Sequence, residues 1–122
     1  MAPLDVIYIE DDETEGLLMQ FGLEARGIGV LHLSDASPAG LSALETPRYR
    51  AARAVFFDLW IRTVNGIEVA RWLREVGDTR PFFLVTAAEN PDPALLQSLN
   101  IVFLRKPLDY QKLAERIQAL AG

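Results

Sequence analysis

Residues able to hold a metal ion and a phosphoryl group follow four apolar runs of the chain. They are Glu10-Asp11-Asp12, Asp58, Thr86 and the pair Lys106-Pro107. If the four runs are parallel strands of one sheet, their carboxyl ends share one edge, where open α/β sheets place ligands. The spacing therefore predicts a crevice that gathers carboxylates, a hydroxyl and an ammonium.

The elements that must position these residues can be read from the alternation of apolar runs with amphipathic segments. Such alternation is typical of βα units that form a doubly wound parallel sheet with helices on both faces. Strands that are buried on both sides should be apolar throughout, and Val55-Phe56-Phe57 fits that rule. We expect strands at Leu4 to Ile9, Ile28 to Leu33, Arg53 to Phe57, Phe82 to Thr86 and Ile101 to Leu104.

Helix ends are marked by capping residues, prolines and glycines. Ser37-Pro38, Asp92-Pro93 and Asp109 should begin helices, and Gly27 and Gly77 should end them. The apolar positions expected on the helices are Leu17, Leu18, Phe21 and Ala25 in a first helix from about Thr14 to Arg26, Ile67, Ala70 and Leu73 in a later one, and Tyr110, Leu113, Ile117 and Leu120 in the last.

Composition limits the class of protein. A chain of 122 residues, half of them apolar, suits one domain with its own core, which we expect to span residues 1–122. The net charge of -5 argues against direct nucleic-acid binding, because no basic excess is present to contact phosphates. There is no cysteine, secretory signal or apolar run of membrane-spanning length, so we expect a cytoplasmic protein without membrane contact.

Four motifs, in this order, resemble the receiver domain of two-component response regulators over essentially the whole chain. They are Ile7-Tyr8-Ile9-Glu10-Asp11-Asp12-Glu13, Phe56-Phe57-Asp58-Leu59-Trp60 with Gly66 eight positions after the aspartate, Leu84-Val85-Thr86-Ala87, and Phe103-Leu104-Arg105-Lys106-Pro107. The resemblance implies a flavodoxin-like sheet of strand order 2-1-3-4-5, in which the first and third strands are neighbours.

The same resemblance implies a role for each site residue. Asp58 would accept the phosphoryl group, while Thr86 and Lys106 contact its oxygens. Mg²⁺, or Mn²⁺ in its place, would be bound by Asp11, Asp58 and the carbonyl of Trp60, with Glu10 acting through water. Such a protein catalyses only its own phosphorylation and dephosphorylation and is not otherwise an enzyme.

The resemblance also implies partners and an output. A sensor histidine kinase or a histidine phosphotransfer protein would donate the phosphoryl group, and Thr86 and Phe103 would form a switch. That switch would change the face made by the fourth helix, fifth strand and fifth helix, which an unknown downstream protein reads. We expect a monomer or weak dimer, because Asn90-Pro91-Asp92-Pro93 should leave the fourth helix short.

Further features of the sequence bear on these expectations. Arg62 stands four residues after Asp58, where the family commonly has a proline, so the loop above Asp58 should be less restrained than usual. Trp60 and Ala88 should set the lifetime of the phosphorylated form by shaping water access to it. His32 lies alone within the second predicted strand, and we interpret it as having no role in the site.

Other readings use the same residues. Glu10-Asp11-Asp12 alone would be an acidic helix start favoured by the helix dipole. A degenerate receiver could serve only as an interaction module, although it would not need the complete set of Glu10, Asp11, Asp58, Thr86 and Lys106. A phosphatase with an aspartyl nucleophile would require an acid two residues after Asp58, where Trp60 stands.

Overall fold

The computed structural model describes residues 4–37, 41, 44, 47–87 and 90–120. Twelve elements are assigned in this part of the chain. In chain order they are β1 (Leu4–Ile9), α1 (Glu13–Glu24), β2 (Gly29–Leu33), α3 (Pro47–Arg50), β3 (Ala54–Asp58), β4 (Trp60–Ile61), β5 (Val64–Asn65), α4 (Gly66–Glu75), β6 (Phe82–Thr86), α5 (Pro93–Ser98), β7 (Ile101–Arg105) and α6 (Tyr110–Gln118).

The main sheet has five parallel strands in the order β2-β1-β3-β6-β7. This order is the predicted 2-1-3-4-5 once the two-residue strands β4 and β5 are set aside, and each expected strand lies within one residue of its observed bounds. The doubly wound α/β fold is therefore confirmed. The short antiparallel hairpin β4–β5, which follows Asp58, was not expected, and Arg62 in its turn has a left-handed φ of 58°.

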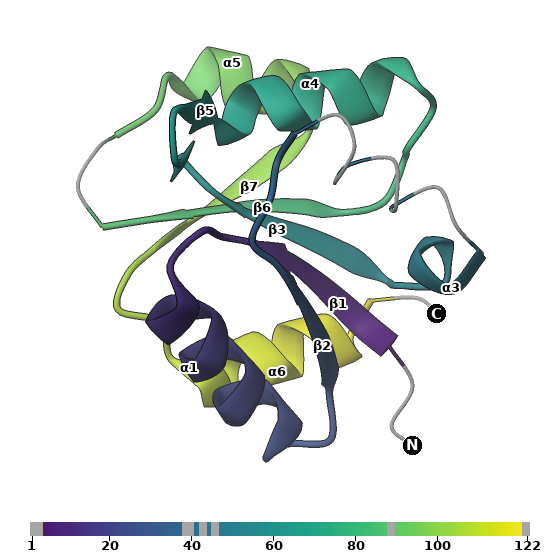
Figure 1. Ribbon diagram of the computed structural model, residues 1–122, viewed down its shortest axis with the longest axis vertical. Coiled ribbons are helices and arrows are strands. Elements are labelled where there is room, and N and C mark those ends of the chain that lie inside the picture. The colour runs from purple at the N-terminus through teal and green to yellow at the C-terminus, as the bar shows by residue number, and fades with distance from the viewer. Residues whose placement is uncertain (1–3, 38–40, 42–43, 45–46, 88–89, 121–122) are drawn as a thin grey trace.

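Each face of the sheet carries its own apolar cluster. Side chains that alternate along β1 and β3 point to opposite faces, so Tyr8 and Phe56 join one cluster while Ile7, Ile9 and Phe57 join the other. Helices α1 and α6 cover the first face, and α4 and α5 cover the second (Figure 1). Both faces of the central strands are thus dry, which explains why their sequences are apolar throughout.

Helix α1 turns a different face to the sheet than its leucines predicted. Leu17, Leu18 and Phe21 are 48%, 49% and 68% exposed, whereas Met19 and Leu23 are fully buried. The reason is close packing at two glycines that lie on the buried side. A Cβ on Gly16 would lie 2.3 Å from the His32 ring, and one on Gly22 would lie 2.5 Å from the Tyr110 ring. The apolar positions expected on this helix, Leu17, Leu18, Phe21 and Ala25, are therefore exposed and are not the residues that face the sheet.

The other helix signals agree with the structure where it describes them. The side chains of Asp92 and Asp109 cap α5 and α6, and α5 has six residues, as short as expected. Gly27 and Gly77 adopt positive φ of 81° and 97° beyond the ends of α1 and α4. The helix expected to start at Ser37-Pro38 falls largely outside the described residues. None of the described helices is long and apolar enough to cross a bilayer.

The two faces of α1 can be distinguished by a pair of substitutions. Leu23→Ala removes a fully buried side chain and should lower the free energy of unfolding by about 2–4 kcal/mol. Phe21→Ala removes a larger but mostly exposed ring and should cost less than about 1 kcal/mol. Chemical denaturation of both variants measures the difference. A larger loss for Phe21→Ala would show that the leucine and phenylalanine stripe is buried after all.

Candidate functional site

The carboxyl ends of the parallel strands bring together the residues that the sequence singled out. Glu10 follows β1, Asp58 ends β3, Thr86 ends β6 and Lys106 follows β7. Strands β1 and β3 are direct neighbours, so Glu10 and Asp58 lie side by side although they are 48 positions apart in the sequence. The backbone N–H of Lys106 donates to the Thr86 carbonyl at 3.0 Å, which ties the last two strand ends together.

Lys106 is the centre of this cluster. Its ammonium donates to Asp58 Oδ2 at 3.2 Å, and Glu15 Oε2 and Glu10 Oε2 lie 3.5 and 3.6 Å from it. Its side chain is only 15% exposed. Burial opposes the charge, but the attraction of Asp58, Glu10 and Glu15 outweighs it and raises the pKa of Lys106. The lysine is therefore a permanent cation held against the candidate phosphoacceptor.

Asp58 is half-buried and both of its side-chain oxygens are engaged. Oδ1 accepts the backbone N–H of Leu59 at 2.7 Å, and Oδ2 accepts from Lys106. Gly66 lies against the backbone of the same residue, because a Cβ there would stand 2.0 Å from the Asp58 carbonyl oxygen. Gly66 also donates its N–H to the Leu59 carbonyl at 2.7 Å. The glycine eight positions after Asp58 thus permits a close return of the chain under the candidate site.

Glu10 is a buried carboxylate, with 2% of the residue exposed. It accepts hydrogen bonds from the Tyr8 hydroxyl at 3.2 Å and from the Asp12 backbone N–H at 3.1 Å. Burial, followed by its hydrogen bond with Asp58, raises the pKa of Glu10 to about 8. Burial and the charge of Glu10 also raise the pKa of Tyr8, so its hydroxyl keeps its proton and remains a donor.

His32 contacts the site, contrary to the interpretation that it has no part there. Its Nε2 donates to the Glu10 backbone carbonyl at 2.5 Å, and its ring lies over Gly16 of α1 and near the ring of Tyr8. Tyr8 and His32 therefore hold the carboxylate and the carbonyl of Glu10 respectively. The predicted strand order already placed the strand that contains His32 beside the strand that precedes Glu10. The spacing of residues in the sequence does not show that the His32 ring reaches the Glu10 carbonyl.

The remaining predicted metal ligands are less closely gathered. Asp11 is half-buried in the bend after β1, and within the described part of the chain it forms no hydrogen bond or ion pair. Trp60 begins β4 with 49% of the residue exposed. The described residues contain no ready-made group of three or more carboxylate, histidine or cysteine side chains positioned to hold a metal. Ala88, predicted to act with Trp60, lies outside the described residues.

The donor chemistry nevertheless fits a hard divalent cation. Glu10 and Asp58 present carboxylate oxygens from adjacent strand ends, and both lie against the Lys106 ammonium. Asp11 adds a carboxylate that is committed to no other partner among the described residues. Glu10, Asp11 and Asp58 are thus the right kind of ligand for Mg²⁺, although their side chains are not arranged around one point.

Thr86 and Phe103, the predicted switch residues, lie on adjacent strands. Thr86 is buried, and Phe103 packs partly buried against the cluster beneath α4 and α5. Arg105, which the sequence did not single out, contacts both Phe103 and the residue that follows Thr86. Its guanidinium carbon is 5.3 Å from the Phe103 ring centroid, and its Nη1 donates to the Ala87 carbonyl at 3.1 Å. Its other amino group bonds Asn90.

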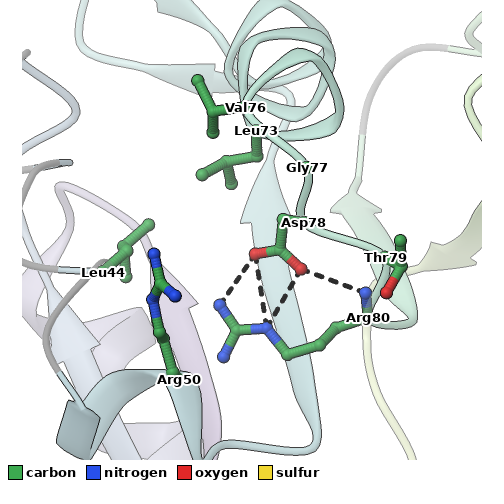
Figure 2. A pocket seen from close by; sticks show the side chains of 8 residues that line it. All are labelled: Leu44, Arg50, Leu73, Val76, Gly77, Asp78, Thr79 and Arg80. Carbon is green, nitrogen blue, oxygen red and sulfur yellow. Dashed lines mark hydrogen bonds and ion pairs between the residues drawn. The ribbon is translucent and has the colours of Figure 1, made fainter.

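A separate cavity of about 240 Å³ lies at the opposite edge of the sheet, where β3 and β6 begin (Figure 2). It is lined by Leu44, Arg50, Leu73, Val76, Gly77, Asp78, Thr79 and Arg80. Arg80 forms a 2.7 Å ion pair with Asp78 and donates to the carbonyls of Tyr49 and Ala52. This guanidinium is therefore engaged in holding loops together, far from the residues around Lys106.

The proton on Glu10 should make stability depend on pH. The pKa of Glu10 is raised from 4.5 to about 8 in the folded protein, so the folded state holds this proton more tightly than the unfolded state does. The stabilisation from the bound proton is complete below pH 4.5 and is lost as the pH rises through about 8. Without divalent cations, the free energy of unfolding should fall by about 1–3 kcal/mol between about pH 5 and pH 8. Glu10→Gln should lack most of this slope in denaturation experiments, and equal slopes would show that Glu10 ionises normally.

Comparisons with known proteins agree with the fold. No family model matches the chain. It is 30% identical over 121 residues to a probable transcriptional regulatory protein of Picosynechococcus sp., covering 94% of this chain and 48% of that protein. It is 32% identical to the transcriptional regulatory protein QseB of Haemophilus influenzae, covering 94% and 51%. The chain thus spans about half the length of these curated relatives.

A relative of similar length and two solved structures extend the match. The polar-differentiation response regulator DivK of Brucella anthropi is 26% identical, with 98% of both chains covered. The chemotaxis protein CheY4 of Vibrio cholerae superposes with a TM-score of 0.81 at 16% identity, covering 98% of this chain and 100% of that one. A receiver domain from Methylobacillus flagellatus gives 0.80 at 24%, covering 97% and 98%. In sequence the chain is similar to response regulators, and its fold is the one seen in solved receiver domains of such proteins.

Proposed function

We propose that this receiver domain accepts a phosphoryl group on Asp58. The donor would be the phosphohistidine of a sensor kinase or of a histidine phosphotransfer protein. One observation supports the proposal above all others: the Lys106 ammonium contacts Asp58 Oδ2 at 3.2 Å in a crevice that Glu10 also enters. A phosphorylation-independent interaction module would not need this buried group of charges at the strand ends.

Phosphoryl transfer to Asp58 requires of the protein mainly that charged and polar groups be positioned around the phosphoryl group. An oxygen of Asp58 forms a bond to phosphorus while the bond from phosphorus to the donor imidazole nitrogen breaks, and that nitrogen keeps the electron pair and leaves as imidazole. Lys106 remains beside the accepting carboxylate and can follow the new phosphoryl oxygens, and the Thr86 hydroxyl would donate to one of them. Attack of water on phosphorus later restores the carboxylate, so the domain turns over no metabolite.

Mg²⁺, or Mn²⁺ in its place, would be held by Glu10, Asp11, Asp58 and the Trp60 carbonyl. When bound, it supplies positive charge that compensates the carboxylates and the phosphoryl oxygens. The protein's own contribution is to keep the ligands in place. Tyr8 and His32 fix the two ends of Glu10, and the Leu59 N–H fixes one oxygen of Asp58.

Phosphorylation would be signalled through Thr86 and Phe103. The phosphoryl group adds charge of about -2, which gives Thr86 and Lys106 a new partner. Movement of Thr86 would allow Phe103 to turn inward, away from Arg105, and thereby alter the loop that Arg105 holds through Ala87. The changed surface, formed by α5, β7 and α6, would be read by a downstream protein.

Phosphorylation can be tested with a small donor and intact-mass measurement. In the presence of Mg²⁺, phosphoramidate should add one phosphoryl mass to the wild-type domain. Asp58→Asn should take up none, because it lacks the attacking carboxylate, whereas Asp35→Asn should react normally, because Asp35 is exposed and its hydrogen bonds among the described residues are to Ser37. Uptake by Asp58→Asn, or no uptake by the wild type, would contradict the proposal.

Metal binding can be tested separately by fluorescence. In Trp72→Phe, which leaves Trp60 as the only tryptophan, Mg²⁺ should change the emission in a saturable titration. Glu10→Gln should bind more weakly by about tenfold, because it replaces an ionisable ligand. An emission that does not respond to Mg²⁺ in the folded protein, together with heat-neutral calorimetry, would remove the metal from the proposed function.

A further inference from the structure

Three described carboxylates form ion pairs with Lys106, and of these Glu15 belongs to neither the phosphoacceptor nor the predicted metal ligands. It lies in the first turn of α1, and its Oε2 is 3.5 Å from the Lys106 ammonium. Its side chain is 38% exposed, compared with 3% for Glu10 and 18% for Asp58. It is thus the member of the cluster that faces solvent.

The space beside this ion pair is hollow. A cavity of about 320 Å³ lies between α1 and the segment after β7, and Glu15, Leu18, Lys106, Leu108 and Tyr110 are among the residues that line it. The Glu15 carboxylate therefore stands at a hollow that reaches the lysine in contact with Asp58. Any phosphodonor that approaches from this side meets its negative charge.

The charges of the cluster do not balance. One ammonium is shared by the carboxylates of Asp58, Glu10 and Glu15, so negative charge is in excess unless a cation or a proton compensates it. Glu15 and Asp58 both contact the same nitrogen, which places their oxygens closer together than the Debye length of about 8 Å at physiological ionic strength. An anionic molecule at Asp58 therefore experiences the Glu15 charge with little screening.

We propose that Glu15 is a specificity-determining residue that disfavours small anionic phosphodonors at Asp58. A donor protein that brings a cationic side chain against Glu15 would replace this repulsion with an attraction. Glu15 also competes with Asp58 for Lys106, so removing its charge leaves the ammonium freer to follow the phosphoryl oxygens. Removing the Glu15 charge should therefore raise the rate of phosphorylation by small anionic donors through both effects. The inference rests on the proposed phosphorylation of Asp58.

The alternative is that Glu15 only stabilises α1, since acidic residues in a first turn favour the helix dipole. Glu13 provides a matched control, because it lies in the same first turn and carries the same charge. Glu13 is exposed and, within the described residues, has no ion pair with Lys106. A purely helical role would make Glu13→Gln and Glu15→Gln equivalent, whereas a role at the site would separate them.

The test measures the rate of Asp58 phosphorylation by acetyl phosphate, a dianionic donor, and by phosphoramidate, which carries less charge. With acetyl phosphate, an oxygen of Asp58 bonds to phosphorus as the bond to acetate breaks, and acetate leaves with the electron pair. At low ionic strength, Glu15→Gln should react about fivefold faster than wild type with acetyl phosphate and by a smaller factor with phosphoramidate. Glu13→Gln should change either rate by less than about twofold.

Ionic strength gives a readout that a change in folding would not reproduce. The advantage of Glu15→Gln should shrink as salt is raised towards about 1 M, where the Debye length is about 3 Å. Glu15→Ala, which also removes the charge, should behave in the same way, and thermal unfolding should show that both variants are folded.

Equal rates for Glu13→Gln and Glu15→Gln, or slower reaction of both Glu15 variants, would overturn the assignment of Glu15 while leaving phosphorylation of Asp58 intact. Absence of phosphoryl uptake by the wild type with either donor would instead overturn the proposed function, and this inference with it.

Discussion

The site depends on one interaction, the sharing of the Lys106 ammonium by carboxylates from β1, α1 and β3. Like charges brought this close would otherwise repel, and at least one would have to bind a proton. Burial, followed by the hydrogen bond with Asp58, raises the pKa of Glu10. The lysine therefore stabilises the crevice at rest, and the same imbalance of charge explains why the crevice suits a divalent cation and a phosphoryl group.

The fold makes this convergence possible through strand order and close packing. Because β1 lies directly beside β3, the residues after both strands meet without any further element between them. Two glycines then allow close approach: Gly66 lies against the backbone of Asp58, and Gly16 lies against the side-chain ring of His32. In each place a methyl group would collide with its neighbour, so packing around the site is as specific as the charged residues themselves.

Much of this could be predicted from the sequence, because the strands are long, apolar and buried on both faces. Because Glu10, Asp58, Thr86 and Lys106 stand at or just after the ends of these strands, the sequence alone predicts that they share one edge of the sheet. The hairpin β4–β5 escaped prediction because strands of two residues carry no periodic pattern. The exposed face of α1 was misjudged because Leu17, Leu18 and Phe21 outweigh Met19 and Leu23 in apolar content, while the close contacts at Gly16 and Gly22 leave no periodic signal.

Side-chain contacts across elements were the least predictable part. His32 bonds to Glu10, and Glu15 to Lys106, only because β2 and α1 are held at particular distances from β1 and β7. Linear spacing carries no information about those distances. Similarly, the sequence predicts Asp11 as a metal ligand but not its surroundings: it lies half-buried in the bend after β1, with no hydrogen bond or ion pair among the described residues.

The central claim concerns Lys106, and the chain favours a direct measurement because its only other lysine is Lys112, which is exposed on α6. Side-chain ammonium NMR should resolve Lys106 as a slowly exchanging signal, distinct from that of Lys112. With phosphoramidate and Mg²⁺, the Lys106 signal should shift in the wild type and not in Asp58→Asn. A Lys106 ammonium that exchanges as fast as that of Lys112, and does not respond when Asp58 is phosphorylated, would contradict the account.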